Sequence, residues 1–569
     1  MNESVRKEAI DFLENQKQFH LGFLPTEQSN PLTRNLDGEF AASTVRGVKN
    51  LQSVDRNVLK MAEKIIKSAE FEKLCTTALN TVKNGGRLIF SGCGATGRLS
   101  ILLECMWRKC CNSRPQLEKY ADQTASIMTG GDYALVKSVE FFEDYQSFGR
   151  RQAADLNINE NDMLLAITEG GETSSVLGTL FEALERKAKV FLMFNNPADL
   201  LAEHLERSRK AICDPGVCVL DLHCGPMALA GSTRMQATSS EQLISGAALE
   251  YVIAVLSGLP IPDTAGNFRK LLDALETEEN VEAIAGAIDF EAGVYRKKGY
   301  ITYFAHDYML DIFTDTTERS PTFMLPPFRK KDDTVSPRPW SFVKDPTLTT
   351  GEVWQYGMMR ALRCLQWDQE DYKKLGASDK IKENIPAIDQ NELFKFEVGH
   401  ESLNDRIPTG NDGAVLVTVD GAENSKLINV FKAVSEKFSG SIHIDIGGNC
   451  NGQYKIKCKF PETPLNLMEH MAVKLVLNTV STGIMACLGR ISGNWMSYVD
   501  VSNKKLIDRA IRLISEIGGV SYEKACFDIF EAIWNIKNTH DNSNEKPSAV
   551  QYVLQNYRKQ QSLHKNQVR

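Results

Sequence analysis

The feature that most constrains this chain is a glycine-rich turn between a short apolar run and a helical pattern. The run Arg87–Phe90 is typical of a buried strand, and Gly92, Gly94 and Gly97 follow it closely. Glycines let the backbone turn sharply and approach a ligand, and the amides that begin the next helix point at an anion. The sequence therefore predicts an anion-binding turn within a strand–helix unit.

Apolar runs of strand length alternate with longer amphipathic segments over residues 85–260. Such alternation is typical of a parallel sheet with helices on both faces, in which ligands bind beyond the carboxyl ends of the strands. We therefore predict a doubly wound α/β fold of the flavodoxin-like kind. The expected strands are Arg87–Phe90, Ala125–Met128, Met163–Ile167, Val190–Phe194 and Val217–Leu222.

A second, less regular α/β series follows, and helical patterns close the chain. Its expected elements are a helix near Glu278–Lys298, strands at Tyr300–Ala305, Ala414–Val419 and Ser441–Ile446, and a helix at Lys426–Phe438. The segment Ser320–Pro346 is rich in proline and charge, which predicts an extended loop. Helices at Leu506–Ile517 and Ser521–Ile536 predict a small cap, on which the apolar Val550–Leu554 can dock.

The length of 569 residues allows several domains. The patterns predict an N-terminal segment (1–45), a first α/β domain that holds the ligand (46–280), a second α/β domain (281–503), and a helical cap and tail (504–569).

Charge and composition exclude several classes of protein. The net charge of -7 argues against a nucleic-acid binder, because such proteins usually carry a basic face. No run approaches the roughly 18 apolar residues that span a bilayer, and the polar start lacks the apolar core of a signal peptide. We expect a cytoplasmic protein that binds no membrane, and leave a nuclear location open.

The 13 cysteines are scattered without a CxxC pair, which favours reduced thiols. Cys213, Cys218 and Cys224 are grouped, but their spacing fits no common zinc pattern. We expect neither a metal nor a cofactor.

The glycine turn allows more than one ligand. Its spacing is formally GxGxxG, the dinucleotide fingerprint, but that motif expects an acidic residue at the end of the next strand. Met128–Gly131 occupies that position here and contains none. Ser91, Thr96 and Arg98 instead supply hydroxyl and cationic donors, which suit a monophosphate. A dinucleotide site and glycines kept only for packing stay open as alternatives.

A second turn of small and hydroxyl residues, Thr168–Ser175, follows the strand Met163–Ile167. Because the carboxyl ends of parallel strands meet at one edge of a sheet, we expect Thr168 and Gly170 to face the same ligand as the first turn.

The segment Ser91–Leu99 resembles the sugar-phosphate-binding turn of the SIS (sugar isomerase) domain family. The similarity is to the branch that contains the bacterial N-acetylmuramic acid 6-phosphate etherases and the glucokinase regulatory proteins. Further segments carry it: Ser29–Thr33 followed by Leu36-Asp37, Gly130–Asp132, Gly231–Met235, Leu477–Gly483, Leu488–Arg490, Gly493-Asn494 and Val501–Leu506.

The order of these segments resembles the tandem arrangement of the regulatory proteins, which also carry a helical cap. Gly231–Met235 closes a first copy and Leu477–Gly483 closes a second. The second copy's turn, Phe304–Tyr308, has no glycine and contains an acid, so we expect it not to bind phosphate. The resemblance thus implies one site per chain, built by the first copy and completed by the second.

The resemblance implies a phosphorylated hexose or amino sugar as ligand, bound by Ser91, Gly92, Cys93, Gly94, Ala95, Thr96, Gly97, Arg98, Glu140, Glu143, Thr168, Gly170, Glu318 and Lys474. For Lys474, the alternative to a ligand contact is a solvated or structural role. A glutamate pair, Glu140 and Glu143, can equally form a solvated helix face, since residues three apart share one side of a helix.

Two carboxylates match the acid–base glutamates of the etherases. Glu318 begins a segment similar to Glu-Cys-Pro-Pro-Thr-Phe, and Glu143 lies in one similar to Val-Glu-x-x-Glu-Asp. Elimination across an ether needs a base and an acid, which two carboxylates in different environments can supply. In the alternative, both only bind sugar hydroxyls.

Our leading expectation is a regulator that binds fructose 6-phosphate-type ligands and inhibits a glucokinase. The alternative is an etherase in tandem form that releases D-lactate from N-acetylmuramic acid 6-phosphate. An aldose–ketose isomerase, or a sugar sensor without a kinase partner, stays possible because a fold does not fix a function.

Overall fold

The computed structural model describes residues 2–139, 141–401, 406–420, 425–501, 503–539 and 547–567. Glu140 of the predicted site and Ser502 of the family-like segment lie outside these residues.

The first five strands form one parallel sheet in the order β2-β1-β3-β4-β5. They are β1 (Leu88–Gly92), β2 (Thr124–Met128), β3 (Met163–Ile167), β4 (Lys189–Phe194) and β5 (Val217–Asp221). Leu88 and Phe90 of β1 face one apolar core, whereas Ile89 faces another. The sheet is therefore covered on both faces, and the predicted doubly wound α/β fold is confirmed.

The second sheet repeats this arrangement, in the order β10-β9-β8-β6-β7, with all neighbours parallel. Its strands are β6 (Ile301–Phe304), β7 (Ser341–Lys344), β8 (Gly413–Val419), β9 (Gly440–Gly447) and β10 (Tyr454–Lys457). In both sheets the second strand lies outside the first, and the third, fourth and fifth follow on the other side. Two copies of one topology therefore follow each other in the chain.

The prediction of an extended loop over Ser320–Pro346 is wrong at both ends. Helix α14 (Met309–Phe323) runs through Pro321, and β7 lies inside the predicted loop. Proline removes one helical hydrogen bond, but it lies in the last turn of α14. Phe323 is fully buried there, so packing outweighs the local cost.

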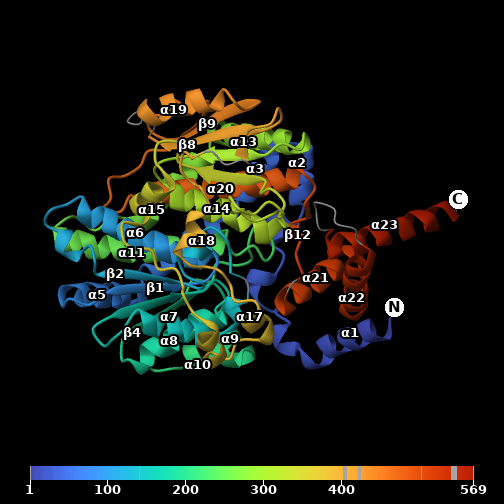
Figure 1. Ribbon diagram of the computed structural model, residues 1–569, viewed down its shortest axis with the longest axis horizontal. Coiled ribbons are helices and arrows are strands. Elements are labelled where there is room, and N and C mark those ends of the chain that lie inside the picture. Colours follow the sequence, from blue (N-terminus) through green and yellow to red (C-terminus); the bar gives the residue numbers. More distant parts are fainter. Residues whose placement is uncertain are drawn as a thin grey trace.

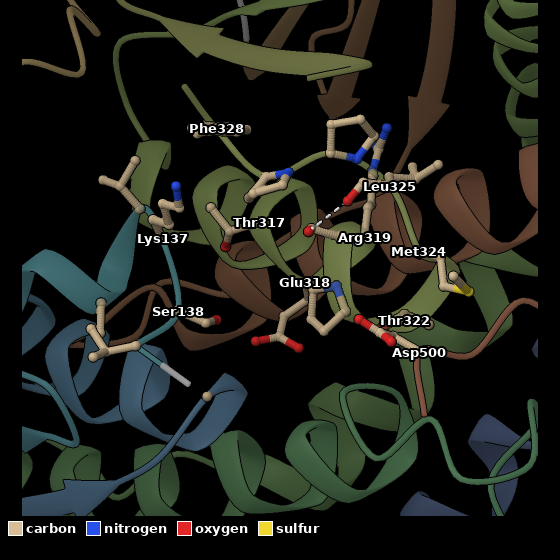
Figure 2. A pocket seen from close by; sticks show the side chains of 18 of the residues that line it. Lys137, Ser138, Thr317, Glu318, Arg319, Thr322, Met324, Leu325, Phe328 and Asp500 are labelled. Carbon is tan, nitrogen blue, oxygen red and sulfur yellow. Dashed lines mark hydrogen bonds between the residues drawn. The ribbon is translucent and has the colours of Figure 1, made fainter. Parts of the chain in front are cut away.

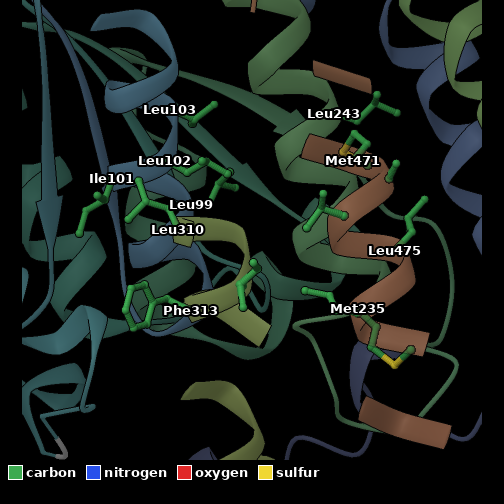
Figure 3. Close-up of a cluster of buried hydrophobic side chains, with 14 of the residues drawn as sticks. Leu99, Ile101, Leu102, Leu103, Met235, Leu243, Leu310, Phe313, Met471 and Leu475 are labelled. Carbon is green, nitrogen blue, oxygen red and sulfur yellow. The ribbon is translucent and has the colours of Figure 1, made fainter. Parts of the chain in front are cut away.

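Equivalent helices of the two copies pack against each other. Helix α6 (Ala95–Asn112), which follows β1, contacts α14, which follows β6; α11 (Gln236–Ser257) contacts α20 (Leu467–Cys487) in the same way. Figure 3 shows the apolar side chains at this junction: Leu99, Leu102, Leu103, Leu243, Leu310, Phe313, Met471 and Leu475. Burying one such side chain contributes roughly 1.5–3 kcal/mol, so this core holds the copies together.

The predicted helical cap consists of α21 (Lys504–Gly518), α22 (Tyr522–Thr539) and α23 (Ala549–Gln567). Val550 and Leu554 are buried in its core, as expected for a docked segment. Figure 1 shows the N-terminal helix α1 (Glu3–Asn15) beside this cap, and the two share an apolar core.

The rest of the N-terminal region packs elsewhere. Helices α2 (Leu36–Ala42) and α3 (Thr44–Gln52) contact α20 of the second copy, and α3 also contacts α13 (Glu278–Arg296). The predicted domain boundaries stay a prediction, but residues 1–45 share cores with both the cap and the second copy.

Candidate functional site

A cavity of about 1740 Å³ lies where the first copy, the second copy and the cap meet. The glycine turn contributes Cys93 and Gly94, the segment before α11 contributes Gly231–Arg234, and α21 contributes Lys505 and Arg509. Figure 2 shows Glu318 and Thr322 of α14 at this cavity, with Ser138 of the first copy opposite and Asp500 close by. The cavity is therefore composite, as the tandem arrangement predicts.

The glycine turn depends on the absence of side chains. A Cβ on Gly92 would lie 2.3 Å from the carbonyl carbon and oxygen of Thr96, and one on Gly97 would lie 2.8 Å from Met128 Cγ. Gly94 has a φ of 57°, in the region that favours glycine. Helix α6 begins at Ala95, so its first amides lie directly at the turn.

Two predicted hydroxyl donors support the turn from inside. The Thr96 hydroxyl accepts the amide N–H of Cys93 (3.0 Å) and donates to the Cys93 carbonyl (2.8 Å). The Ser91 hydroxyl accepts the Thr179 hydroxyl (2.7 Å) and is buried. Thr96 therefore closes the turn upon itself, whereas Ser91 connects its base to Thr179 outside the turn.

Arg98 connects the turn to the second copy. Its guanidinium is buried and donates to the carbonyls of Leu135 and Ala134, each at 3.0 Å. It also forms an ion pair with Glu318. Because the two backbone carbonyls hold the Arg98 guanidinium in place, the ion pair positions the Glu318 carboxylate next to the turn.

The two candidate carboxylates line the same cavity, Glu143 from the first copy and Glu318 from the second. Glu143 lies in the short helix η6 (Phe142–Asp144). Burial raises the pKa of the Cys93 thiol, and the carboxylates of Glu143, Glu169 and Glu318 raise it further. Glu143 of the first copy and Glu318 of the second therefore line one cavity within a single chain, and their roles stay a prediction.

Lys474 lies behind the cavity wall. Its ammonium donates to the Arg234 carbonyl (2.6 Å) and to Asn478 Oδ1 (3.0 Å), and burial lowers its pKa to about 8. Arg234 itself donates to Asp315 (2.9 Å) in a buried ion pair. Lys474 thus supports the Gly231–Arg234 segment, and its contact with a ligand stays a prediction.

The second turn lies beside the first. Thr168 is fully buried and its hydroxyl contacts that of Thr173 at 3.0 Å. Glu169, which the sequence analysis did not select, accepts the Thr238 hydroxyl (3.2 Å), and burial raises its pKa to about 7. The carbonyl of Gly170 accepts Asn196 Nδ2 (3.1 Å). None of Thr168, Glu169 and Gly170 is among the described residues that line the cavity, so the contact of this turn with a ligand stays a prediction.

Three residues that line the cavity were not among the ligand-binding residues predicted from the sequence. Ser232 is only 3% exposed, and its hydroxyl has no hydrogen-bond partner within the described residues. Lys505 and Arg509 come from the cap and bring positive charge. The signal was present for Ser232 and Lys505, because Gly231–Met235 and Val501–Leu506 carry the family resemblance, whereas Arg509 lies outside both segments.

The turn of the second copy contains no glycine, and two of its side chains, His306 and Asp307, form ion pairs. His306 Nδ1 lies 2.6 Å from Asp345 Oδ2, and Lys109 of the first copy forms an ion pair with Asp307 at 3.4 Å. None of these residues lines the described cavity. Its expected inability to bind phosphate stays a prediction.

Within the described residues, no group of three histidine, cysteine or acidic side chains is placed to hold a metal ion. None of the described helices is long and apolar enough to cross a membrane.

Comparison with known proteins gives relatives of the first copy. Residues 70–184 match the family model of the glucokinase regulatory protein N-terminal SIS domain. The chain is 32% identical over 226 residues, 39% of its own length and 68% of the relative's, to N-acetylmuramic acid 6-phosphate etherase of Lactococcus lactis subsp. lactis. It is 29% identical over 227 residues, 40% of its own length and 67% of the relative's, to etherase 1 of Bacillus licheniformis.

Among solved structures, tagatose-6-phosphate ketose/aldose isomerase from Escherichia coli is 10% identical with a TM-score of 0.42. The comparison covers 79% of this chain and 93% of that chain.

Proposed function

The chain belongs to the SIS-domain family of the N-acetylmuramic acid 6-phosphate etherases, with a first copy like that of glucokinase regulatory protein, and we propose that it cleaves the lactyl ether of such a sugar phosphate. Its first copy is a sugar-phosphate-binding SIS domain. The observation that carries the proposal is one composite cavity in which the glycine turn meets Glu143 and Glu318.

The chemistry needs two proton transfers. A base takes a proton from the sugar carbon next to the ether carbon, and the electron pair forms a double bond as the carbon–oxygen bond breaks. An acid gives a proton to the departing lactyl oxygen, and water then adds to the double bond. Glu143 and Glu318 divide these roles, because carboxyl groups in different surroundings differ in proton affinity. Amides at the start of α6 hold the phosphate.

We expect the purified protein to release lactate from N-acetylmuramic acid 6-phosphate. Glu318→Gln and Glu143→Gln keep the size of each side chain but remove its acid–base function, so each should lower kcat by about 100-fold or more, on the order that general acid–base catalysis supplies. Lactate is measured with a coupled enzymatic assay. Glu182→Gln, on the distant end of helix α8 (Ser174–Glu185), is the control and should leave the rate unchanged. Wild-type protein that binds the sugar phosphate without releasing lactate would contradict the etherase.

A second candidate is a sugar-phosphate-responsive regulator of a glucokinase. Two observations favour it: the match of residues 70–184 to the regulator's domain, and the tandem arrangement of two copies with a cap. We expect such a protein to inhibit a hexokinase-type glucokinase to an extent that fructose 6-phosphate changes. Kinase activity that is the same with and without the protein, at saturating fructose 6-phosphate, would exclude this candidate. A cytoplasmic location stays a prediction.

A further inference from the structure

Lys505 of the cap is held by a carboxylate of the first copy. Its ammonium donates to Glu172 Oε1 at 2.8 Å, and Arg207 donates to Glu172 Oε2 at 2.5 Å. Glu172 lies in the turn between β3 and α8, and Arg207 lies in α10 (Glu206–Ile212). We call Lys505, Glu172 and Arg207 the clasp.

The clasp reaches the cavity through one of its members, Lys505. Lys505 lines it and is 33% exposed, whereas the Glu172 side chain is 9% exposed. Burial opposes the charge of Glu172, but Lys505 and Arg207 lower the pKa of its carboxyl group to about 2. A lasting negative charge therefore lies beside an ammonium group that faces the ligand cavity.

We propose that Glu172 is an internal anion that competes with the phosphate of the ligand for Lys505, and that it thereby determines the affinity of the site. The inference rests on the proposed sugar-phosphate site. A phosphate that reaches the cavity meets a lysine whose charge is already offset. Glu172 also repels the arriving dianion, because its charge lies directly behind the ammonium group that lines the cavity and is only partly screened there.

The opposite effect of Glu172, holding Lys505 in position, is weaker. An ion pair with one partner a third exposed does little to fix a long side chain, and an ammonium group has three donors, of which Glu172 takes one. Repulsion therefore outweighs positioning, and removing the charge of Glu172 should tighten phosphate binding.

Competition for Lys505 also changes which group the first turn of α21 is bonded to. Lys505 lies in the first turn of α21, so its partner decides whether this end of the cap is anchored to the β3–α8 turn or to the ligand. Arg509 and Arg512 keep α21 attached through their ion pairs with Glu27. The cap therefore stays in place while Lys505 exchanges its partner.

The test measures binding of fructose 6-phosphate and of inorganic phosphate to the full chain by calorimetry. Glu172→Gln should lower the Kd for both probes about tenfold, which corresponds to about 1.4 kcal/mol of binding free energy. Arg207→Gln should raise the Kd, because Glu172 then acts on Lys505 alone. Opposite signs in neighbouring residues cannot arise from partial unfolding, which weakens binding in both variants.

Two controls complete the experiment. In a Lys505→Met background, Glu172→Gln should lose most of its effect, since the contested partner is gone. Glu182→Gln, which removes an ion-paired glutamate from the other end of α8, should change no affinity. If the wild type binds and Glu172→Gln binds equally or more weakly, the inference is wrong while the proposed site stands. If neither protein binds either probe, the proposed site itself fails, and the inference with it.

Discussion

At the scale of single residues, the site depends on close approach and on buried charge. The absence of a side chain at Gly92 allows close contact between the backbones of β1 and Thr96. The ion pair with Arg98 holds the Glu318 carboxylate next to the turn. Glu169 brings a carboxyl group into surroundings that favour its neutral form. Each of these features gives a measurable consequence.

Gly92→Ala should abolish sugar-phosphate binding and lower the free energy of unfolding by about 1–3 kcal/mol, the usual cost of overpacking. The added Cβ meets backbone atoms of Thr96 at 2.3 Å, and these cannot rotate away. Gly357→Ala is the matched control, because its Cβ would meet no atom within 4 Å. Chemical denaturation and calorimetry measure the two effects, and normal sugar-phosphate binding by the Gly92→Ala variant would contradict the assigned turn.

Glu169 should make stability depend on pH in a defined direction. Burial raises its pKa in the folded protein to about 7, from 4.5 in the unfolded chain. The stability that the raised pKa of Glu169 gives the folded protein is complete below pH 4.5. It is lost as the pH rises to about 7, which lowers the free energy of unfolding by up to about 3 kcal/mol. Glu169→Gln should therefore become more stable relative to the wild type between about pH 5 and 8, as measured by urea unfolding. A difference that is constant over this range would show that Glu169 does not titrate there.

At the scale of elements, local pattern predicted some helices and strands and missed others. The strands of the first sheet lie within a few residues of their expected positions, because each is a bounded apolar run. Strand β10 alternates, with Ile456 buried between exposed lysines, and β7 lies in a proline-rich segment. These elements form through pairing with β9 and β6, which local sequence does not reveal.

The attachment of cap helix α21 gives a prediction at this scale. Glu27 is 2% exposed and pairs with Arg509 and Arg512. Glu27→Gln leaves the Arg509 guanidinium without its carboxylate, whereas Arg512 keeps its ion pair with Asp508. Breaking a buried pair in this way costs about 3–5 kcal/mol. We expect the Glu27→Gln substitution to speed hydrogen exchange in α21 more than in α11, relative to the wild type, as measured by mass spectrometry. Glu3→Gln, at an exposed ion pair of α1, is the control. Equal exchange in the variant and the wild type would show that Glu27 does not anchor the cap.

At the scale of the whole molecule, the two copies form one structural unit. A single apolar core includes side chains of α6 and α11 from the first copy and of α14 and α20 from the second. The N-terminal helices add to the cores of the cap and the second copy. The composite cavity exists only because these parts are fixed against one another.

The shared core predicts that both copies unfold together. Urea unfolding followed by tryptophan fluorescence and by circular dichroism should give coincident transitions, which is the criterion for two-state behaviour. Leu475→Ala, at the junction of the copies, should lower the free energy of unfolding in both curves by about 2–5 kcal/mol. Two separated transitions, of which only one responds to the substitution, would contradict a common core.

The sequence by itself determined the doubly wound fold and the glycine turn, because these follow from local spacing, and its family-like segments singled out Glu143 and Glu318 as candidates. Only the tertiary structure decided that Ser91 and Thr96 turn inward, that Lys474 supports a wall, and that Lys505 reaches the cavity. The physical reason is that direction and partner of a side chain depend on residues far away in the chain, as Glu172 and Lys505 illustrate.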